Sequence, residues 1–236
     1  MSFQLIIFDK DGTLIDFHSM WGGWVEELAR RLESASSKII SGQLFRAMGY
    51  DQASGRVLAH GKLAATPMAQ LYDLTMAVMM EEGLPAKSAQ AMVAHAWHIP
   101  DPVALARPCA DLMALFTTLS ERGIKIAVAT TDDRSPTLAT LAGLGLASFV
   151  DALVCADDGV PVKPAPEMAW EVCRAVGVEP RETVVVGDTV ADLLMGQAAG
   201  VGRVVGVLTG VSSAGDLTPL ADVVMASVGK LMDVIP

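Results

Sequence analysis

Short runs of β-branched and other apolar residues alternate along the chain with longer stretches in which apolar residues recur at helical spacing. The apolar runs are residues 5–8, 125–129, 152–155, 183–186, 204–208 and 222–225. Uninterrupted runs of this length are typical of strands buried on both faces of a sheet. The amphipathic stretch 112–119, which ends before Gly123, is typical of the helices between them. The alternation predicts an α/β fold with a doubly wound parallel sheet, because parallel strands need crossover connections that are usually helical.

The stretch 17–100 has a different pattern. Helical periodicity is found near residues 23–33, 41–48, 68–82 and 86–97, and we find no strand run there. Basic and acidic residues are balanced in this stretch, which also holds all 4 histidines, so the net negative charge comes from the rest of the chain. Such a shift in composition is typical of an inserted module. We expect a core domain of residues 1–16 and 101–236 and, between its parts, a small α-helical domain of residues 17–100 with about four helices.

Composition excludes several classes of protein. The chain of 236 residues is 52% hydrophobic and 19% charged, which is typical of a folded globular protein. Its net charge of -10, without a run of basic residues, argues against nucleic acid as a partner. The longest uncharged stretch, 135–150, is too short to span a membrane. The first residues have no basic region and soon meet Asp9, so we expect no secretory signal and a cytoplasmic location.

Two acidic residues follow the first predicted strand. Asp9 and Asp11 lie two residues apart in the segment FDKDGTL, where Gly12 allows a tight turn. At the carboxyl end of a central parallel strand, both carboxylates would reach the crevice in which open α/β sheets bind ligands. The same pattern is common in solvated turns and calcium loops, so on its own it does not define a site.

Further polar residues lie just past other predicted strands. These residues are Thr130, Lys163, Asp188 and Asp192. Each has an ordinary alternative role: Thr130 or Asp192 as a helix cap, Lys163 as a surface lysine, and Asp188 as a turn residue. Their order on consecutive strand ends of one sheet favours a single shared site.

With these residues the chain resembles the haloacid-dehalogenase-like hydrolases. The four motifs of that family are matched by residues 9–13, Thr130, Lys163, and residues 187–188 with Asp192. The resemblance spans the whole chain, because the stretch 17–100 is similar to the family's cap domain. Within the family, the sequence is most similar to phosphoglycolate-phosphatase-like phosphatases. Dehalogenating members lack the second aspartate, so Asp11 favours phosphoryl transfer.

The aspartates also predict a metal ion. Asp9, Asp11, Asp188 and Asp192 would repel one another severely if they converged on a phosphate dianion without counter-charge. Oxygen ligands and a phosphorylated substrate select Mg²⁺. The resemblance implies that the ligands are the Asp9 carboxylate, the Asp11 backbone carbonyl and Asp188. It also implies that Asp192 orients water or Lys163 instead.

A chemical hypothesis follows from the same residues. Asp9 attacks phosphorus and forms an aspartyl-phosphate, and Asp11 protonates the departing alkoxide and then takes a proton from water. Thr130, Thr131 and Lys163 bind the phosphoryl group. The expected activity is therefore a Mg²⁺-dependent phosphatase that hydrolyses a small phosphomonoester, either phosphoglycolate-like or a sugar phosphate.

The substrate is left open between several small phosphorylated metabolites. Many phosphoglycolate-type relatives carry asparagine at the position of Thr131, and Asp132 and Asp133 add negative charge beside it, which an anionic carboxylate substrate must avoid. A phosphosugar mutase of the same family and a non-catalytic binding protein are the alternatives, and the protein is expected to be a monomer or a homodimer.

In the cap, a few aromatic and histidine side chains are candidates for facing the crevice. These are His18, Trp21 and Trp24. The favoured interpretation is that the tryptophans pack the helical bundle and that His18 is a solvated linker residue. His60, His95 and His98 have no metal-ligand partners in the sequence, so we expect them in the core or on the surface.

Overall fold

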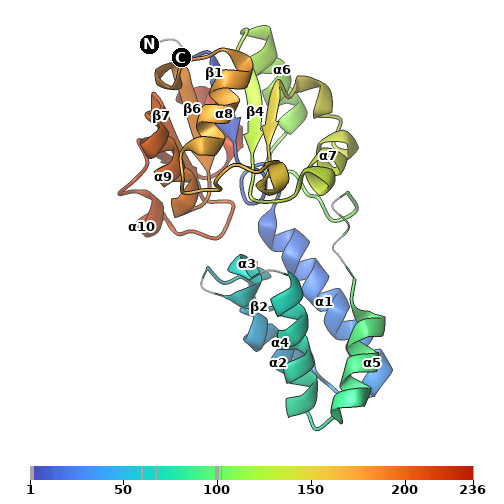
Figure 1. Cartoon of the computed structure of the whole chain (residues 1–236). Helices are drawn as coiled ribbons and strands as arrows, with labels where there is room; N and C mark the ends of the chain where they lie inside the picture. The colour runs from blue at the N-terminus through green and yellow to red at the C-terminus, as the bar shows by residue number, and fades with distance from the viewer. Residues whose placement is uncertain (1–2, 60, 67, 99–100, 102, 236) are drawn as a thin grey trace. The chain divides into compact units, whose positions relative to one another are not determined.

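The computed structural model of the chain describes residues 3–59, 61–66, 68–98, 101 and 103–235. The chain divides into two compact units, one formed by Met1–Phe17 with Pro102–Pro236 and the other by His18–Asp101 (Figure 1). His60 and the expected domain boundary at residue 100 lie outside the described residues. Among the helices of the described part, none combines the length and the apolar character that a bilayer crossing requires.

A six-stranded sheet forms the centre of the first unit, which we call the core unit. The strand order is β5-β4-β1-β6-β7-β8, and every pairing in this sheet is parallel. The strands are β1 (Leu5–Phe8), β4 (Lys125–Ala129), β5 (Ala152–Val154), β6 (Thr183–Gly187), β7 (Arg203–Val207) and β8 (Val223–Met225). The predicted α/β fold with a doubly wound parallel sheet is confirmed, and the predicted strands differ from the observed ones by a residue or less at each end.

Helices cover both faces of this sheet (Figure 1). They are α6 (Leu112–Glu121), α7 (Arg134–Gly143), α8 (Glu167–Val176), α9 (Val190–Ala199) and α10 (Ala214–Leu217), with 3₁₀ turns at Ala147–Phe149, Ala156–Asp158, Pro180–Glu182 and Val228–Asp233. Phe8 packs on one face against Phe116 of α6, with ring centroids 5.5 Å apart. Ile7 packs on the other face in a cluster with Met168 of α8. Burial on both faces explains why the strands are continuous apolar runs.

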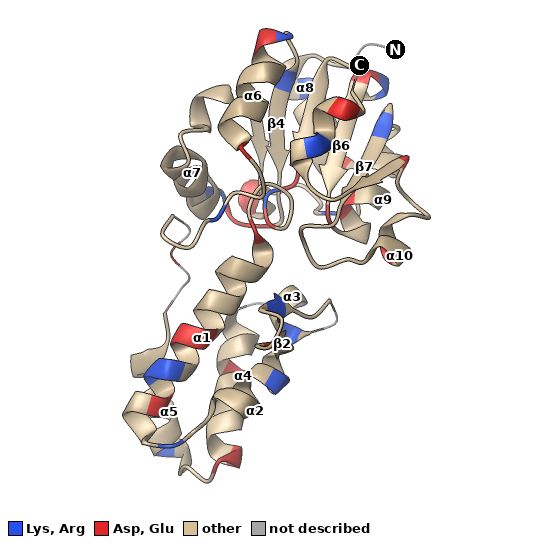
Figure 2. Ribbon diagram, turned by 180° about the vertical axis from the view of Figure 1, so that it is seen from behind, with Lys and Arg blue, Asp and Glu red and all other residues tan. Residues whose placement is uncertain are grey.

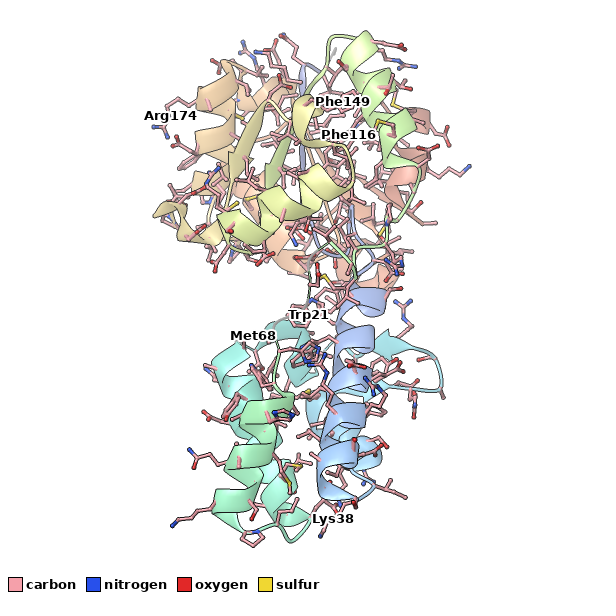
Figure 3. All side chains as sticks on the ribbon, turned by 90° about the vertical axis from the view of Figure 1, so that its right-hand side faces the viewer. Trp21, Lys38, Met68, Phe116, Phe149 and Arg174 are labelled. Carbon is pink, nitrogen blue, oxygen red and sulfur yellow. The ribbon has the colours of Figure 1, made fainter. Side chains whose placement is uncertain are left out.

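Phe116 also links the sheet to the 3₁₀ turn at Ala147–Phe149. Its ring centroid lies 6.3 Å from that of Phe149 in an edge-on arrangement, and Figure 3 shows both rings inside the core unit. Aromatic pairs of this geometry add roughly 0.5–1.5 kcal/mol to the stability that their buried area provides. The packing therefore fixes α6 against the sheet and against this turn.

The order of the strands puts β1 at the topological switch point. After β1 the chain returns to β4 on one side, and it later crosses to β6 on the other. Phe8 is in register with Val128 of β4 and with Val186 of β6. Because the three strands are parallel and in register, the residues that follow them emerge at one edge of the sheet, where open α/β folds bind ligands.

The second unit, which we call the cap unit, is mainly helical. Its helices are α1 (Phe17–Ser36), α2 (Ser41–Met48), α3 (Lys62–Ala65), α4 (Met68–Glu81) and α5 (Ala86–Ala96). It also contains a two-stranded antiparallel pair, β2 (Tyr50–Asp51) with β3 (Arg56–Val57), so the expectation of no strand here was wrong. Strands of two residues are too short to produce a periodic pattern. Their turn contains Gly55 at a φ of 66°, a left-handed conformation that glycine adopts without steric cost.

The aromatic residues of the cap unit pack its interior. Trp24 is fully buried, and its ring centroid lies 5.9 Å from that of Trp21 and 5.3 Å from that of Trp97. His18 is also buried, and its Nδ1 accepts a hydrogen bond of 3.1 Å from the backbone N–H of Val57. The interpretation of His18 as a solvated linker residue was therefore wrong. The reason is the unexpected β3 strand, whose buried N–H needs an acceptor.

Candidate functional site

The turn after β1 presents the first acidic residue. The Asp9 N–H donates a hydrogen bond of 2.9 Å to the Val186 carbonyl, which continues the pairing of β1 with β6. The Lys10 carbonyl then accepts bonds from Leu14 (2.9 Å) and Ile15 (3.0 Å), which closes a compact turn. Gly12 occupies this turn at a φ of 92°, a conformation that other residues rarely adopt. The turn therefore holds Asp9 at the carboxyl end of the central strand.

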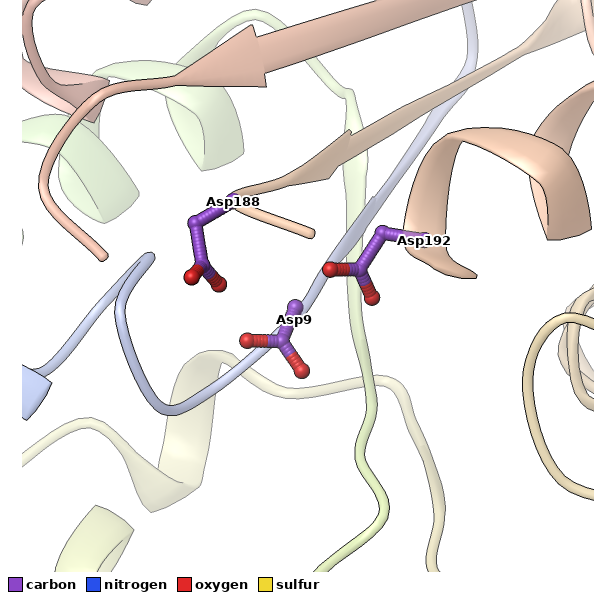
Figure 4. Close-up of side chains that lie close together, drawn as sticks. All are labelled: Asp9, Asp188 and Asp192. Carbon is purple, nitrogen blue, oxygen red and sulfur yellow. The ribbon is translucent and has the colours of Figure 1, made fainter. Parts of the chain in front are cut away.

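Three buried aspartates converge at this edge of the sheet. Asp9 follows β1, Asp188 follows β6, and Asp192 lies in the first turn of α9. One carboxylate oxygen from each lies within 4.8 Å of the others (Figure 4). Figure 2 shows acidic residues, drawn in red, in the loops at the carboxyl ends of the strands. Two strand ends and the first turn of α9 therefore bring these three carboxylates together.

The aspartate cluster is electrostatically unfavourable when its members are all charged. The pKa of Asp9 is raised to about 7, mainly by burial and also by the neighbouring carboxylates of Asp192 and Asp11, against the opposing effect of Lys163. Burial together with the charges of Asp9 and Asp192 also raises the pKa of Asp188 well above its ordinary value. An additional positive charge at this position would lower the pKa values of both Asp9 and Asp188.

Lys163 supplies one positive charge to the cluster. Its Nζ lies 2.6 Å from Oδ1 of Asp9 and 2.6 Å from Oδ1 of Asp192, and all three side chains are buried. Burial alone would lower the pKa of Lys163, but the charges of Asp192 and Asp9 outweigh it and raise this pKa. The lysine therefore stays protonated and joins the loop after β5 to the centre of the site.

Two hydrogen-bond donors hold the Asp188 carboxylate, and two nearby glycines leave space for it. Its Oδ2 accepts a bond of 3.0 Å from the Val211 N–H, and its Oδ1 accepts one of 3.4 Å from the Thr13 hydroxyl. A Cβ at Gly210 would lie 1.7 Å from Oδ2 of Asp188, and one at Gly12 would lie 2.5 Å from its Cγ. Glycine at both positions leaves room for the carboxylate.

Asp192 has both of its oxygens engaged. Its Oδ2 accepts bonds from the Thr189 backbone N–H (2.9 Å) and hydroxyl (2.6 Å), which completes a capping box at the start of α9. Its Oδ1 contacts Lys163. Asp192 is therefore occupied as a helix cap and as a partner of the lysine, whereas Asp188 keeps unused acceptor capacity.

The donor set fits a hard divalent cation. Carboxylate oxygens from Asp9, Asp188 and Asp192 are the group in the described residues that meets the geometry for holding a metal ion. Oxygen-only ligands select Mg²⁺ or Ca²⁺ over softer metals, and Mg²⁺ is usually held by one or two carboxylates. Because Asp192 is engaged elsewhere, Asp9 and Asp188 are the pair best able to hold such an ion.

The remaining residues predicted from the sequence lie around this centre with different partners. The Asp11 carboxylate contacts Lys10 and does not belong to the aspartate cluster. Thr130 is buried at the end of β4, where its N–H donates to the Val154 carbonyl (2.9 Å) and its hydroxyl accepts from the Asp132 N–H (3.1 Å). Thr131 is exposed. The roles expected for Asp11, Thr130 and Thr131 stay predictions.

Sequence reasoning missed three contributors to the site. Lys10 pairs with Asp11 and Asp132, the Val211 N–H holds Asp188, and the Thr209 hydroxyl donates a bond of 2.5 Å to the Gly12 carbonyl. Apart from its position between two aspartates, nothing in the sequence around Lys10 predicts that it belongs to the site. The residues after β7 form a loop that returns to the first motif, where Thr209 contacts Gly12.

Comparison with known proteins identifies the family to which the chain belongs. The model of the haloacid dehalogenase-like hydrolase family matches residues 3–200. A phosphoglycolate phosphatase of Rhodospirillum rubrum is 31% identical over 86% of this chain and 78% of that protein. The pyrophosphatase PpaX of Halalkalibacterium halodurans is 35% identical over 56% of this chain and 61% of that protein, so the chain spans less than two thirds of that relative.

The fold has solved counterparts as well. A subfamily IA hydrolase of the same superfamily from Geobacter sulfurreducens PCA aligns over 99% of this chain and 97% of its own, with a TM-score of 0.70 and 19% identity. The sheet, the strand-end aspartates and the family match define the class of protein: this chain belongs to the haloacid dehalogenase-like hydrolases. The resemblance found in the sequence is confirmed, and the protein is a hydrolase of that family.

Proposed function

We propose that the protein is a magnesium-dependent phosphatase that hydrolyses a small phosphomonoester through an aspartyl-phosphate on Asp9. The observation that carries this proposal is the position of Asp9, which contacts Lys163 at 2.6 Å and shares a buried cluster with Asp188 and Asp192. A carboxylate nucleophile beside a fixed cation, at the switch point of a parallel sheet, is suited to attack on phosphorus. The family and the printed activities of its relatives support this choice.

The residues of the chain divide the reaction between them. Asp9 attacks phosphorus in line and forms a bond to it while the bond to the alkoxide breaks. Asp11 gives a proton to the departing alkoxide and later takes one from the water that attacks the aspartyl-phosphate. Thr130, Thr131 and Lys163 bind the phosphoryl oxygens, and Lys163 offsets their charge in a site that excludes bulk water.

Mg²⁺ is the cation that the site is proposed to hold, through the carboxylates of Asp9 and Asp188 and the backbone carbonyl of Asp11. When bound, it supplies counter-charge to the phosphate and to the carboxylates. Asp192 holds Lys163 and caps α9, which leaves the position of the lysine independent of the cation.

The proposed substrates are small phosphomonoesters such as phosphoglycolate or a sugar phosphate. From the sequence, Asp132 adds a negative charge that an anionic substrate would have to avoid. In the structure the Asp132 carboxylate lies 3.0 Å from the buried Lys10 ammonium, which also pairs with Asp11, so this charge is partly compensated within the protein. This pairing weakens the argument against a carboxylate-bearing substrate, although the charge of the exposed Asp133 is still to be avoided.

Phosphate release from a panel of phosphorylated compounds tests the proposal. The panel contains phosphoglycolate, several sugar phosphates and pyrophosphate, each with Mg²⁺ and with a chelator. We expect Mg²⁺-dependent release by the wild type and a loss of at least ~10³-fold in Asp9→Asn. Asp233→Asn, which changes an exposed aspartate of the core unit, is the matched control and should retain activity.

Two results would contradict the proposal. One is wild-type turnover by an Asp9→Asn protein whose sequence has been verified. The other is an absence of phosphate release from every compound in the panel. Interconversion of sugar phosphates that requires a sugar bisphosphate, without net release, would assign the site to a phosphosugar mutase.

A further inference from the structure

Lys10 is a buried lysine in the middle of the first motif, and the chemistry proposed above gives it no role. The residue is 2% exposed, and its Nζ lies 2.7 Å from Oδ1 of Asp11 and 2.6 Å from Oδ2. The same nitrogen lies 3.0 Å from Oδ2 of Asp132. Lysine is almost never fully buried unless its charge is paired, and here the pairing involves the proposed acid/base residue.

We propose that Lys10 is a positioning residue that fixes the carboxylate of Asp11 for proton transfer to the leaving group. The inference rests on the proposed phosphatase function and deepens it. Because the ammonium group contacts both oxygens of Asp11, rotation of that carboxylate away from its place breaks an ion pair. A proton donor held in one orientation loses less freedom when it transfers its proton, which is the advantage of a prearranged group.

Asp132 anchors the ammonium group from the other side. Its Oδ1 accepts a bond of 2.8 Å from the Asp133 N–H, and its own N–H donates a bond of 3.1 Å to the Thr130 hydroxyl. The Asp132 carbonyl also accepts a bond of 3.0 Å from Ala156, in the 3₁₀ turn after β5. Asp132 is therefore held by both neighbouring loops, and it gives Lys10 a fixed partner.

The contacts form a continuous path between two functional groups. The path runs from Asp11 through Lys10 and Asp132 to Thr130, and it joins the turn after β1 to the loop after the adjacent strand β4. Thr130 is the residue proposed to bind a phosphoryl oxygen. The path therefore sets the acid/base group in register with the place where phosphate is proposed to bind.

The backbone of Lys10 supports the same role. Its carbonyl accepts the two hydrogen bonds from Leu14 and Ile15 that close the turn after β1. Burial alone would lower the pKa of Lys10, but the charges of Asp11 and Asp132 raise it above its ordinary value. The side chain therefore starts from a fixed backbone and stays charged.

A series of leaving groups distinguishes positioning of the acid from general damage. A nitrophenolate departs without a proton, whereas an alkoxide needs one from Asp11. For Lys10→Met we expect kcat/KM to fall ~50-fold with an alkyl phosphate and less than ~5-fold with p-nitrophenyl phosphate, because acid catalysis is worth ~10²–10⁴-fold and a mobile acid loses part of it. The parameter kcat/KM reports the steps up to departure of the leaving group. Lys230→Met, at an exposed lysine of the core unit, should leave both values unchanged.

Two further variants keep the test decisive. Asp132→Asn leaves Lys10 in place and weakens its anchor, so it should show a smaller loss with the same dependence on the leaving group, even where Lys10→Met does not fold. In an Asp11→Asn background, Lys10→Met should add no further selective loss, since the group that it positions is already gone. Thermal unfolding of each variant establishes that it is folded.

The outcomes separate this inference from the proposed function. Equal losses by Lys10→Met and Asp132→Asn on all esters, with active wild type, would overturn the positioning role and leave the phosphatase intact. An absence of hydrolysis by the wild type would overturn both. A loss concentrated on esters with poor leaving groups supports the role of Lys10.

Discussion

The ammonium nitrogen of Lys163 lies 2.6 Å from Oδ1 of Asp9, although the two residues come from strands that are not neighbours in the sheet. Asp9 follows β1, and Lys163 follows β5, which lies beyond β4. The loop after β5 must therefore cross the end of β4 to reach the central strand. Asp192 receives this lysine from the opposite side, so the position of the proposed nucleophile depends on contacts from both halves of the sheet.

Replacement of Lys163 by methionine should destabilise the protein as well as inactivate it. The change leaves the buried carboxylates of Asp9 and Asp192 without their shared cation, and breaking a buried ion pair in this way costs about 3–5 kcal/mol. Urea unfolding in the presence of a chelator measures the loss. The double variant Lys163→Met with Asp192→Asn should recover part of it, and a single variant as stable as the wild type would show that the ion pair contributes nothing.

The stability of the metal-free protein should decrease as the pH rises from about 4 to about 7 through the contribution of Asp9. Burial raises the pKa of this carboxyl from 3.8 to about 7, so the folded state binds more protons than the unfolded state in that range. The contribution is complete below the unfolded pKa and is lost as the pH rises through the folded one. Thermal unfolding against pH in a chelator, with wild type and Asp9→Asn, gives the test: the variant should have a flatter profile, and identical profiles would contradict the assignment.

Mg²⁺ should raise the unfolding temperature if it binds between Asp9 and Asp188. At a concentration 100 times the dissociation constant, a ligand that binds only the folded state adds about 2.7 kcal/mol, which corresponds to roughly 5–10 °C for a domain of this size. Asp188→Asn keeps an acceptor for the Val211 N–H but loses the charge, so its response to Mg²⁺ should be much smaller. Asp233→Asn serves as the control with an unchanged response. Equal shifts in all three proteins would place the cation elsewhere.

Alanine at position 210 should impair the site without altering any charged residue. Its Cβ would lie 1.7 Å from Oδ2 of Asp188, so the carboxylate has to move. A displacement of about 1 Å at a catalytic group typically costs ~10²-fold in rate. Gly215→Ala is the matched control, because its Cβ would meet only the Ser213 hydroxyl at 3.6 Å. Full activity of Gly210→Ala, measured with the best substrate of the panel, would show that Asp188 tolerates displacement.

The core unit could be predicted well from the sequence because its signals are local. The apolar runs that form β1 and β4 coincide with the observed strands, since every residue except the exposed Lys125 at the start of β4 is buried and apolar. Once the strands are parallel, register places the residues that follow them at one edge, so the sequence alone predicts that Asp9 and Asp188 lie close together.

The parts that could not be predicted depend on partners distant in the sequence. The burial of His18 results from a two-residue strand nearly forty positions later, as the contact with Val57 shows. The pairing of Lys10 with Asp132 depends on β1 and β4 lying side by side, which no pattern around Lys10 indicates. Val211 contributes only its backbone N–H, and main-chain donors carry no residue-type signal.

The central place of β1 has a consequence for how the protein fluctuates. Its residues are paired on both sides, with β4 and β6, and their side chains are fully buried, so their amides exchange with solvent only when most of the core unit opens. Asp9 follows directly from this strand. The proposed nucleophile is thus attached to the region with the highest local opening free energy, and slow amide exchange along β1 would mark the site as one of the most persistent parts of the molecule.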